Sequence, residues 1–282
     1  MTPAGFDAAR DGIRRLYCGL SPDVRDRGVC LVVEAFQLFA DDSYSEEYYV
    51  VGGFLAPIGV WEKFTPQWYA ALKESPRLGY YTTNDALGLK GPFAGWGETA
   101  RNTRMAKLAS VVPSENCWGV AAHLRVSDFK DIFAGVFPEW ADPYYLCADY
   151  LVLEACKFLL FERVVEKVDF IFDRQGKVGK RYELHYNIAV KPMALGVLPF
   201  LGECRHENKQ DFLPLQAADM NAAWVRRREA TIQLWTAVDP YLKNLPQFDF
   251  KVERSWLEKL AKFYREHEEE IRAYWNSRLG SE

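Results

Sequence analysis

The sequence lacks the short motifs of several common enzyme classes. It has no Gly-x-Gly-x-x-Gly or Walker-type loop to hold a nucleotide phosphate, and no Gly-x-Ser-x-Gly elbow of a serine hydrolase. Its four histidines show no His-x-x-x-His or cysteine-spaced pattern of a zinc site. We expect them to be surface or hydrogen-bonded residues: His123, His185, His206 and His267.

Cysteine pairs and long apolar runs are also missing. The six cysteines are scattered with no Cys-x-x-Cys pair. Because we also expect no signal peptide, we predict a reduced, cytoplasmic protein whose cysteines are mostly small core residues. No apolar run approaches the roughly 20 residues that span a bilayer, so we expect a soluble protein without a membrane partner.

An excess of positive charge is likewise absent, since the formal net charge is -4 and the pI is ≈ 5.7. No global basic field therefore indicates nucleic-acid binding. An enzyme acting on nucleic acid would need local phosphate contacts, partly supplied by metal ions.

The composition is that of a well-packed globular protein, with 282 residues, 49% hydrophobic and 15% aromatic. Apolar runs predict strands at residues 29–40, 48–56, 117–124, 168–173 and 198–203. Periodic segments predict helices at residues 6–20, 60–72, 99–111, 144–165, 180–190, 214–228 and 252–278. The glycine-rich residues 75–100 indicate a long loop.

This order of elements predicts an α/β fold. The first two strands should form an antiparallel hairpin, and the later strands alternate with helices, which indicates a mixed sheet flanked by helices on both faces. Trp61, Phe64 and Trp68 follow a helical spacing typical of core residues. The Gly52-Gly53 pair within a predicted strand indicates a close backbone approach.

We expect the chain to be divided into a helical extension, a main domain and a second helical extension packed on that domain, at residues 1–27, 28–235 and 236–282.

Carboxylates carry the strongest functional signal. Asp219 stands among alanines in Leu215–Trp224, where a carboxylate is costly to bury unless it is paired or bound to a cation. Asp41-Asp42 and Asp173 each follow an apolar run, at predicted strand ends that can meet. Converging carboxylates need a compensating cation, and hard oxygen ligands suit Mg²⁺ or Mn²⁺.

Two such ions about 3.5–4 Å apart would activate water and stabilise a leaving oxygen in phosphodiester cleavage. A second interpretation is ordinary turn chemistry, in which Asp42 caps a turn with Ser43 and Asp173 ends a strand.

The arginines Arg226-Arg227-Arg228, near a predicted helix end, are also open to two interpretations. The arginines either interact with the helix dipole or bind a backbone phosphate.

Several of these segments together resemble the bacterial and phage domain-of-unknown-function 3800 family, which is related to ribonuclease H-like nucleases. The similarity covers about residues 28–230. It rests on the segments Phe39–Ser43, Val51–Phe54, Trp61–Trp68, Phe170–Asp173 and Leu215–Asp219, which match the family in order. The Leu-Gln-Ala-Ala-Asp segment is the most specific of them.

The resemblance implies a ribonuclease H-like fold with a divalent-metal site at Asp41, Asp42, Asp173 and Asp219. The chain departs from the family pattern in the segment after the first helix, where a Lys or His and a Glu are usual. Here Thr82 stands in place of the basic residue and Asp85 in place of the Glu. Because Asp is one methylene shorter, Asp85 would reach a metal only through water.

The leading hypothesis is a metal-dependent nuclease or phosphodiesterase that acts on RNA or DNA in a mobile-element or phage-defence setting. In this hypothesis Asp41, Asp173 and Asp219 bind metal and Asp42 or Asp85 assists. Substrate-positioning residues would be Gln216, Ser43, Asp85, Arg226 and Arg227.

The rival is a catalytically degenerate binding or assembly module on the same fold, with a protein partner docked on the C-terminal helix. A glycosidase is a weaker third hypothesis, because its two carboxylates face each other across a sugar rather than forming a cluster.

Overall fold

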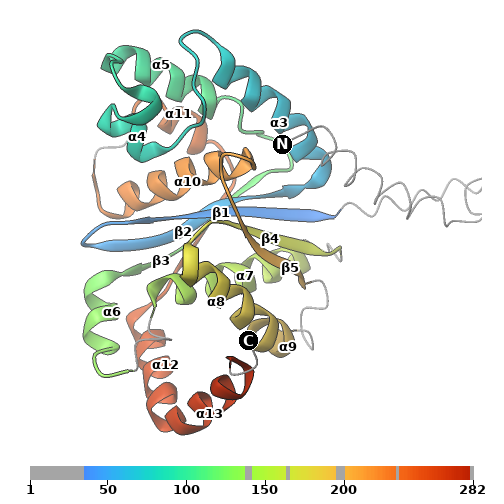
Figure 1. The fold of residues 1–282 in the computed structure, drawn as a ribbon, viewed down its shortest axis with the longest axis vertical. Coiled ribbons are helices and arrows are strands. Elements are labelled where there is room, and N and C mark those ends of the chain that lie inside the picture. The colour runs from blue at the N-terminus through green and yellow to red at the C-terminus, as the bar shows by residue number, and fades with distance from the viewer. Residues whose placement is uncertain (1–34, 137–141, 163–165, 195–200, 233–234, 280–282) are drawn as a thin grey trace, which may run out of the picture.

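The computed structural model describes residues 35–136, 142–162, 166–194, 201–232 and 235–279. The predicted helix at residues 6–20 lies outside the described residues. Within them the chain is an α/β structure built on a six-stranded mixed sheet with the strand order β5-β4-β1-β2-β3-β6 (Figure 1). The strands are β1 (Phe36–Tyr44), β2 (Tyr48–Pro57), β3 (Trp118–Arg125), β4 (Val168–Asp173), β5 (Leu201–Glu207) and β6 (Gln247–Lys251).

The sheet combines an antiparallel meander with parallel strands on either side. β1 pairs with β2 and β2 with β3 in antiparallel fashion, so the predicted hairpin is confirmed. β4 runs parallel to β1, β5 parallel to β4, and β6 parallel to β3. Because Ala40 is level with Phe172 in the parallel pair, the following residues Asp41 and Asp173 lie side by side. The register of two adjacent strands thus brings two of the predicted site residues together.

Helices cover both faces of the sheet, as predicted (Figure 1). On one face lie α3 (Ile58–Lys73), α4 (Thr83–Gly88), η1 (Gly91–Phe93), α5 (Glu98–Ala109), α10 (Pro214–Glu229) and α11 (Asp239–Leu242). On the other lie α6 (Val126–Ile132), α7 (Pro143–Phe161), α8 (Gly176–His185), η2 (Tyr186–Val190), α9 (Lys191–Ala194), α12 (Arg254–Glu266) and α13 (Glu268–Leu279).

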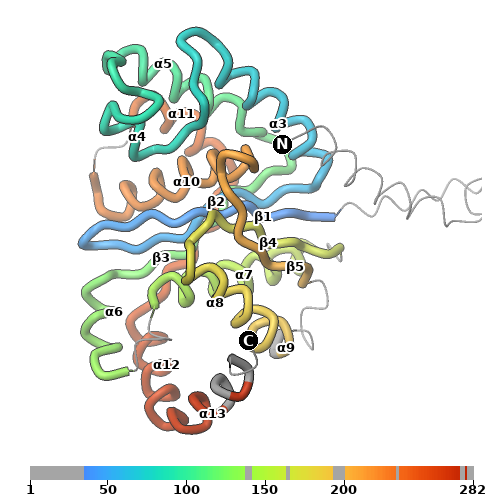
Figure 2. Tube along the Cα trace, in the orientation of Figure 1, coloured from blue at the N-terminus to red at the C-terminus, as the bar shows by residue number. Residues whose placement is uncertain are grey.

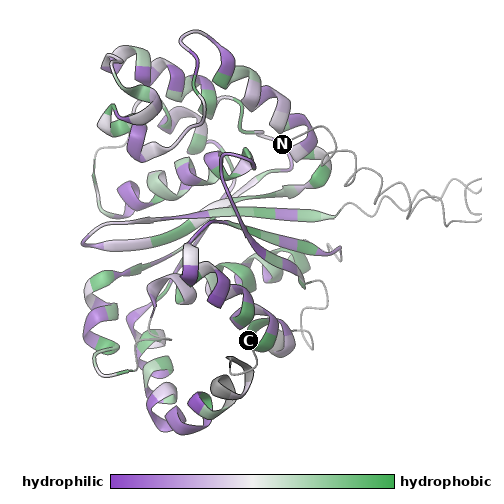
Figure 3. Cartoon of the chain, viewed as in Figure 1, coloured by the Kyte–Doolittle hydropathy of each residue, from purple (hydrophilic) through white to green (hydrophobic). Residues whose placement is uncertain are grey.

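Each face of the sheet has its own hydrophobic core, because side chains alternate along the strands. Leu38 and Ala40 of β1 belong to the core beneath α7, whereas Phe39 belongs to the core beneath α10. Figure 3 shows hydrophobic residues in the middle of the strands and many hydrophilic ones on α12 and α13. Asp41 follows this alternation and is directed toward α10 with only 3% of its surface exposed.

The aromatic residues Trp61, Phe64 and Trp68 are buried, which confirms their predicted place in the core. The cysteines in the described segments are also buried, and they form no disulfide bond: Cys117, Cys147, Cys156 and Cys204. No helix in the described segments combines the length and apolar character needed to cross a membrane.

Several predicted bounds were wrong. β1 does not stop before Asp41-Asp42 but continues to Tyr44, because both aspartates pair with β2 and only their side chains need polar surroundings. Residues 75–100 are not a continuous loop, since they contain α4 and η1. The predicted helix at 252–278 is divided into α12 and α13, and β6 and α6 were not predicted. His123 and His185 are buried, and Nε2 of His185 lies 2.7 Å from Oδ2 of Asp149, in agreement with the expected hydrogen-bonded histidine.

Candidate carboxylate site

The helix α10 lies against the sheet at a short distance because both surfaces are made of small residues. A Cβ atom added to Gly52 of β2 would lie 3.5 Å from the Cα of Ala222. Asn221 fixes the contact, since its Nδ2 donates a hydrogen bond of 2.9 Å to the carbonyl of Gly53. The alanines of α10 therefore let Asp219, on the same helix, approach the strands that carry Asp41 and Asp173.

Three carboxylates from three elements converge on one ammonium group. The Nζ atom of Lys209 lies 2.5 Å from Oδ2 of Asp41, 2.9 Å from Oδ2 of Asp173 and 3.4 Å from Oδ1 of Asp219. These aspartates belong to β1, β4 and α10, and their side chains are between 3% and 13% exposed. The structure thus brings together the three residues that the sequence proposed as metal ligands, with a lysine between them.

Each of these carboxylates has its second oxygen held by a backbone amide. The N–H of Asp42 donates to Oδ1 of Asp41 at 2.8 Å, and the N–H of Thr83 donates to Oδ2 of Asp219 at 2.6 Å. The N–H of Lys209 itself donates to Oδ1 of Asp173 at 3.2 Å. Amide bonds of this kind fix the orientation of a carboxylate. As a result, one oxygen of each carboxylate is anchored and the other is turned toward the same point.

The electrostatics of the cluster favour a retained positive charge. Burial raises the pKa of the Asp41 carboxyl well above its ordinary value, the Lys209 ammonium opposes this rise, and Asp219, Asp173 and Asp42 add to it. Burial alone would lower the pKa of Lys209, but the surrounding carboxylates outweigh it and raise that pKa above its ordinary value. Lys209 therefore remains protonated and serves as the counter-ion of the cluster.

Asp42 faces away from this cluster, on the opposite side of β1. Its Oδ2 accepts a hydrogen bond of 3.0 Å from the hydroxyl of Tyr49, and its Oδ1 accepts one from Nε2 of Gln175. Burial raises the pKa of Asp42, while these two hydrogen bonds oppose the rise. Asp42, which was expected to assist the metal-binding carboxylates, is thus close to the cluster, but its oxygens are directed toward the neutral donors Tyr49 and Gln175.

Gln216, predicted to position substrate, is fully buried and bonded to protein groups. Its Oε1 accepts hydrogen bonds of 3.0 Å from Nε1 of Trp68 and from the N–H of Tyr81. Its Nε2 donates a hydrogen bond of 2.8 Å to the carbonyl of Lys209. With no exposed surface, the Gln216 side chain cannot contact a substrate here. It instead holds the backbone of Lys209 in place.

Two of the other predicted substrate-binding residues contact each other. Nε of Arg226 donates a hydrogen bond of 2.9 Å to Oγ of Ser43. Arg226 stands two helical turns beyond Asp219, so the two residues share one side of α10. Arg227 points elsewhere, with its guanidinium 5.0 Å from the ring centre of Trp235.

Asp85 does not join the carboxylates that surround Lys209. Its backbone N–H is capped by Oγ1 of Thr82 at 3.2 Å, and its carboxylate accepts a hydrogen bond of 3.3 Å from Tyr80. The segment contributes to the site through Thr83, whose amide holds Asp219. Thr82, which stands where a basic residue is usual in the family that the chain resembles, therefore caps the start of α4.

Lys209, the central residue of the site, was not predicted from the sequence. It lies in the connection that leaves β5 and passes on to the start of α10 (Figure 2). β5 runs parallel to β4, and Glu207 is level with Asp173. The residues just after β5 must therefore reach the same sheet edge as Asp173. This signal was missed because the predicted strand ended at residue 203, four residues before Glu207.

The donor set suits a hard divalent cation, but its spacing is set for an ammonium. Carboxylate oxygens are preferred ligands of Mg²⁺ and Mn²⁺. Within the described ranges, no group of three His, Cys, Asp or Glu side chains is spaced to hold a metal ion. The N–O distances of 2.5–3.4 Å at Lys209 exceed the roughly 2.0–2.1 Å of a Mg²⁺–oxygen bond. The residues thus fit a metal by type, and the position where it would lie is that of Nζ.

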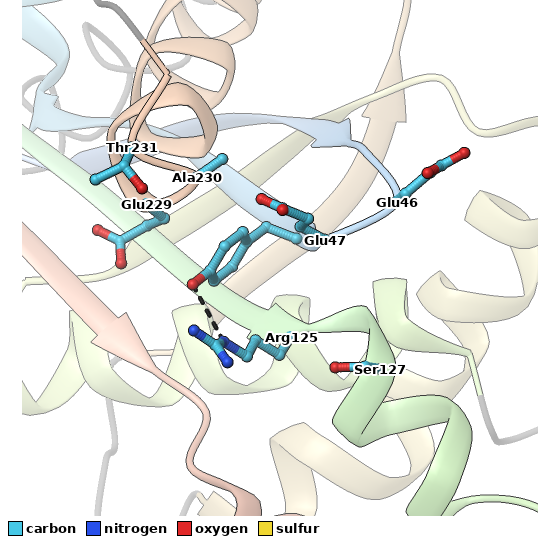
Figure 4. Close-up of a pocket in the computed structure, with 8 residues that line it drawn as sticks. Glu46, Glu47, Arg125, Ser127, Glu229, Ala230 and Thr231 are labelled. Atoms are coloured by element: carbon cyan, nitrogen blue, oxygen red, sulfur yellow. Dashed lines mark hydrogen bonds between the residues drawn. The ribbon is translucent and has the colours of Figure 1, made fainter.

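Apart from the carboxylate cluster, a hollow of about 370 Å³ lies at the turn of the β1–β2 hairpin (Figure 4). Nε of Arg125 donates there to the hydroxyl of Tyr48 at 3.2 Å. The lining includes three glutamates, whose negative charges would repel a phosphate. The residues that line the hollow are Glu46, Glu47, Tyr48, Arg125, Ser127, Glu229, Ala230 and Thr231. This hollow is therefore a poor phosphate site, and the carboxylate cluster remains the candidate functional site.

Comparison of the chain with models of known protein families gives no match, and neither does a search of curated proteins. Its function must therefore be argued from the geometry and chemistry of the carboxylate cluster.

Proposed function

We propose that this protein is a divalent-metal-dependent nuclease or phosphodiesterase of the ribonuclease H-like type, acting on RNA or DNA. The observation that supports it most is the convergence of three carboxylate oxygens, from Asp41, Asp173 and Asp219, on one cation position. An antiparallel meander extended by parallel strands, with helices on both faces, agrees with that type of fold.

In this proposal Asp41, Asp173 and Asp219 hold Mg²⁺ or Mn²⁺. The bound ion would supply Lewis acidity and a water of lowered pKa for attack on a phosphodiester. The chain contributes pre-orientation, because backbone amides of Asp42, Lys209 and Thr83 already fix one oxygen of each ligand. Little side-chain freedom is then lost on binding, which favours affinity and a defined geometry.

The substrate would be held locally, because the chain as a whole is acidic. Arg226 is the best-placed residue for a backbone phosphate, since it shares one side of α10 with Asp219 and is steadied by Ser43. A guanidinium is suited to bidentate phosphate contacts.

The alternative is a binding or assembly module in which the cluster is purely structural. The observation that favours it is the Lys209 ammonium, which already neutralises part of the carboxylate charge. In that case Lys209 would replace the metal permanently, and the site would bind neither Mg²⁺ nor Mn²⁺.

The test of the proposed function is Asp173→Asn, which keeps the hydrogen-bond acceptor for the amide of Lys209 but removes one ligand charge. Changes to groups that only support a metal ligand already cost 10–100-fold, so we expect loss of a ligand to reduce Mn²⁺-dependent cleavage by about 100-fold or more. The measurement is cleavage of single- and double-stranded RNA and DNA, with thermal unfolding to check the fold.

The matched control is Asp211→Asn, which removes an exposed carboxylate from the same turn as Lys209. It should cleave like the wild type. Cleavage by Asp173→Asn at the wild-type rate would contradict the proposed function.

A further inference from the structure

The Lys209 side chain starts from a fixed backbone. Its N–H donates to Asp173, and its carbonyl accepts from the buried amide of Gln216. The backbone is thus held on both sides of the residue, by a strand end and by a helix. Any change in the position of Nζ must come from the side chain alone.

Departure of that side chain from the cluster would leave the backbone contacts of the carboxylates in place. The Lys209 side chain is 18% exposed, which gives it a path to solvent, and the lysine stem has four carbons that rotate freely. The carboxylates would stay in place, because their anchored oxygens are bonded to backbone amides and not to Nζ. The other oxygen of each carboxylate would then face the position that Nζ had occupied, with no cation there.

A metal ion and the ammonium compete for this position. The same three oxygens lie within 3.4 Å of Nζ, whereas an ion coordinated by them would need to be closer to each oxygen. Two cations sharing the set would be in contact and repel each other. Occupancy by one therefore excludes the other.

We infer that Lys209 is a tethered counter-ion that competes with a divalent metal ion for the oxygens of Asp41, Asp173 and Asp219, so that metal enters by exchange with the ammonium. This inference rests on the metal site of the proposed function and deepens it. When metal is absent, the ammonium compensates part of the carboxylate charge. When metal is present, one ion can occupy this position. The displaced ammonium remains attached nearby.

The test compares Mn²⁺ binding by the wild type and by Lys209→Met, which has a similar length and no charge. Calorimetry should show that the variant binds Mn²⁺ about 10-fold more tightly, since affinity at oxygen sites depends on the local charge count. Without metal, the variant should melt at a lower temperature than the wild type, because its carboxylates have lost their counter-ion. Saturating Mn²⁺ should narrow this difference.

The matched control is Lys177→Met, which removes an exposed lysine from α8 and should change neither quantity. Lys209→Gln repeats the comparison with a shorter polar side chain, in case the methionine variant does not fold. A metal-dependent gain of folded protein in either variant would also support the exchange.

The outcomes separate this inference from the proposed function. Equal Mn²⁺ affinity of wild type and both variants would overturn the exchange and leave the metal-dependent function standing. Mn²⁺ binding by the variants but not by the wild type would show that the ammonium is not displaced, which would overturn the exchange and contradict a metal-dependent activity. Absence of binding in all of them would overturn both.

Discussion

At the scale of the residue, the buried amide of Gln216 connects the core to the site. Both of its ends are used: Oε1 accepts from Trp68 and from the backbone of Tyr81, and Nε2 donates to the backbone of Lys209. Buried polar groups are almost always paired, and leaving one unpaired is costly. Gln216 thus supplies the hydrogen bonds that let two loops pass next to a buried helix.

We expect Gln216→Leu to destabilise the protein strongly. It would leave two donors and one acceptor without a partner, and each such group costs about 1–3 kcal/mol. We therefore expect a loss of about 3 kcal/mol in the free energy of unfolding, measured by chemical denaturation. The control is Gln210→Leu, at an exposed position six residues earlier, which should change stability little. A loss below about 1 kcal/mol in Gln216→Leu would contradict this account.

At the scale of the element, the sheet depends on a glycine where β1 and β2 meet. A Cβ atom added to Gly53 would lie 1.8 Å from the carbonyl oxygen of Phe39, far inside van der Waals contact. The clash is with backbone, which cannot move aside as a flexible side chain can. The close approach predicted from the Gly52-Gly53 pair is thus confirmed. It involves Phe39 of β1, which lies two residues before Asp41.

Gly53→Ala should therefore separate β1 from β2 and reduce stability. Overpacking in a core costs 1–3 kcal/mol and sometimes more, so we expect about 3 kcal/mol or more, measured by chemical denaturation. Gly79→Ala is the control, because a Cβ atom at that exposed glycine meets nothing within 4 Å. If both variants unfold at the same denaturant concentration as the wild type, the backbone contact does not limit packing.

How far the elements could be predicted depended on burial. The predicted strand at 168–173 has the bounds of β4, and the predicted helix at 214–228 differs by one residue from α10, because both are rich in buried side chains. β6 was missed because it is an edge strand without a fully buried residue, so no apolar run marks it. β1 was ended too early because sequence alone does not show that Lys209 neutralises Asp41.

At the scale of the whole molecule, the site is a product of topology. Its residues come from β1, β4, α10 and the connection after β5, which span most of the described chain (Figure 1). The acidic members could be predicted, because a carboxylate after an apolar run is visible in the sequence. Lys209 could not be, because its role depends on β5 running parallel to β4, which only the assembled sheet fixes.

The folding free energy of the whole molecule should also depend on pH through a buried histidine away from the site. His123 of β3 is 3% exposed, and its Nδ1 has no hydrogen-bond partner among the described residues. Burial lowers the pKa of His123 from its ordinary value of 6.5, although Glu229 and Asp249 oppose the change. The folded protein thus holds this imidazole neutral at a pH where the unfolded chain protonates it.

Because the unfolded state binds the extra proton, His123 makes its full contribution to stability above pH 6.5 and loses it as the pH falls from 6.5 through the lowered folded-state pKa. A single group changes the unfolding free energy by at most about 1.4 kcal/mol per pH unit. We expect His123→Gln to lose less stability than the wild type between about pH 7 and pH 5, in denaturant titrations at a series of pH values. Parallel curves for His123→Gln and the wild type would show that this imidazole is not held neutral, whereas curves that converge as the pH falls would show that the fold keeps it uncharged.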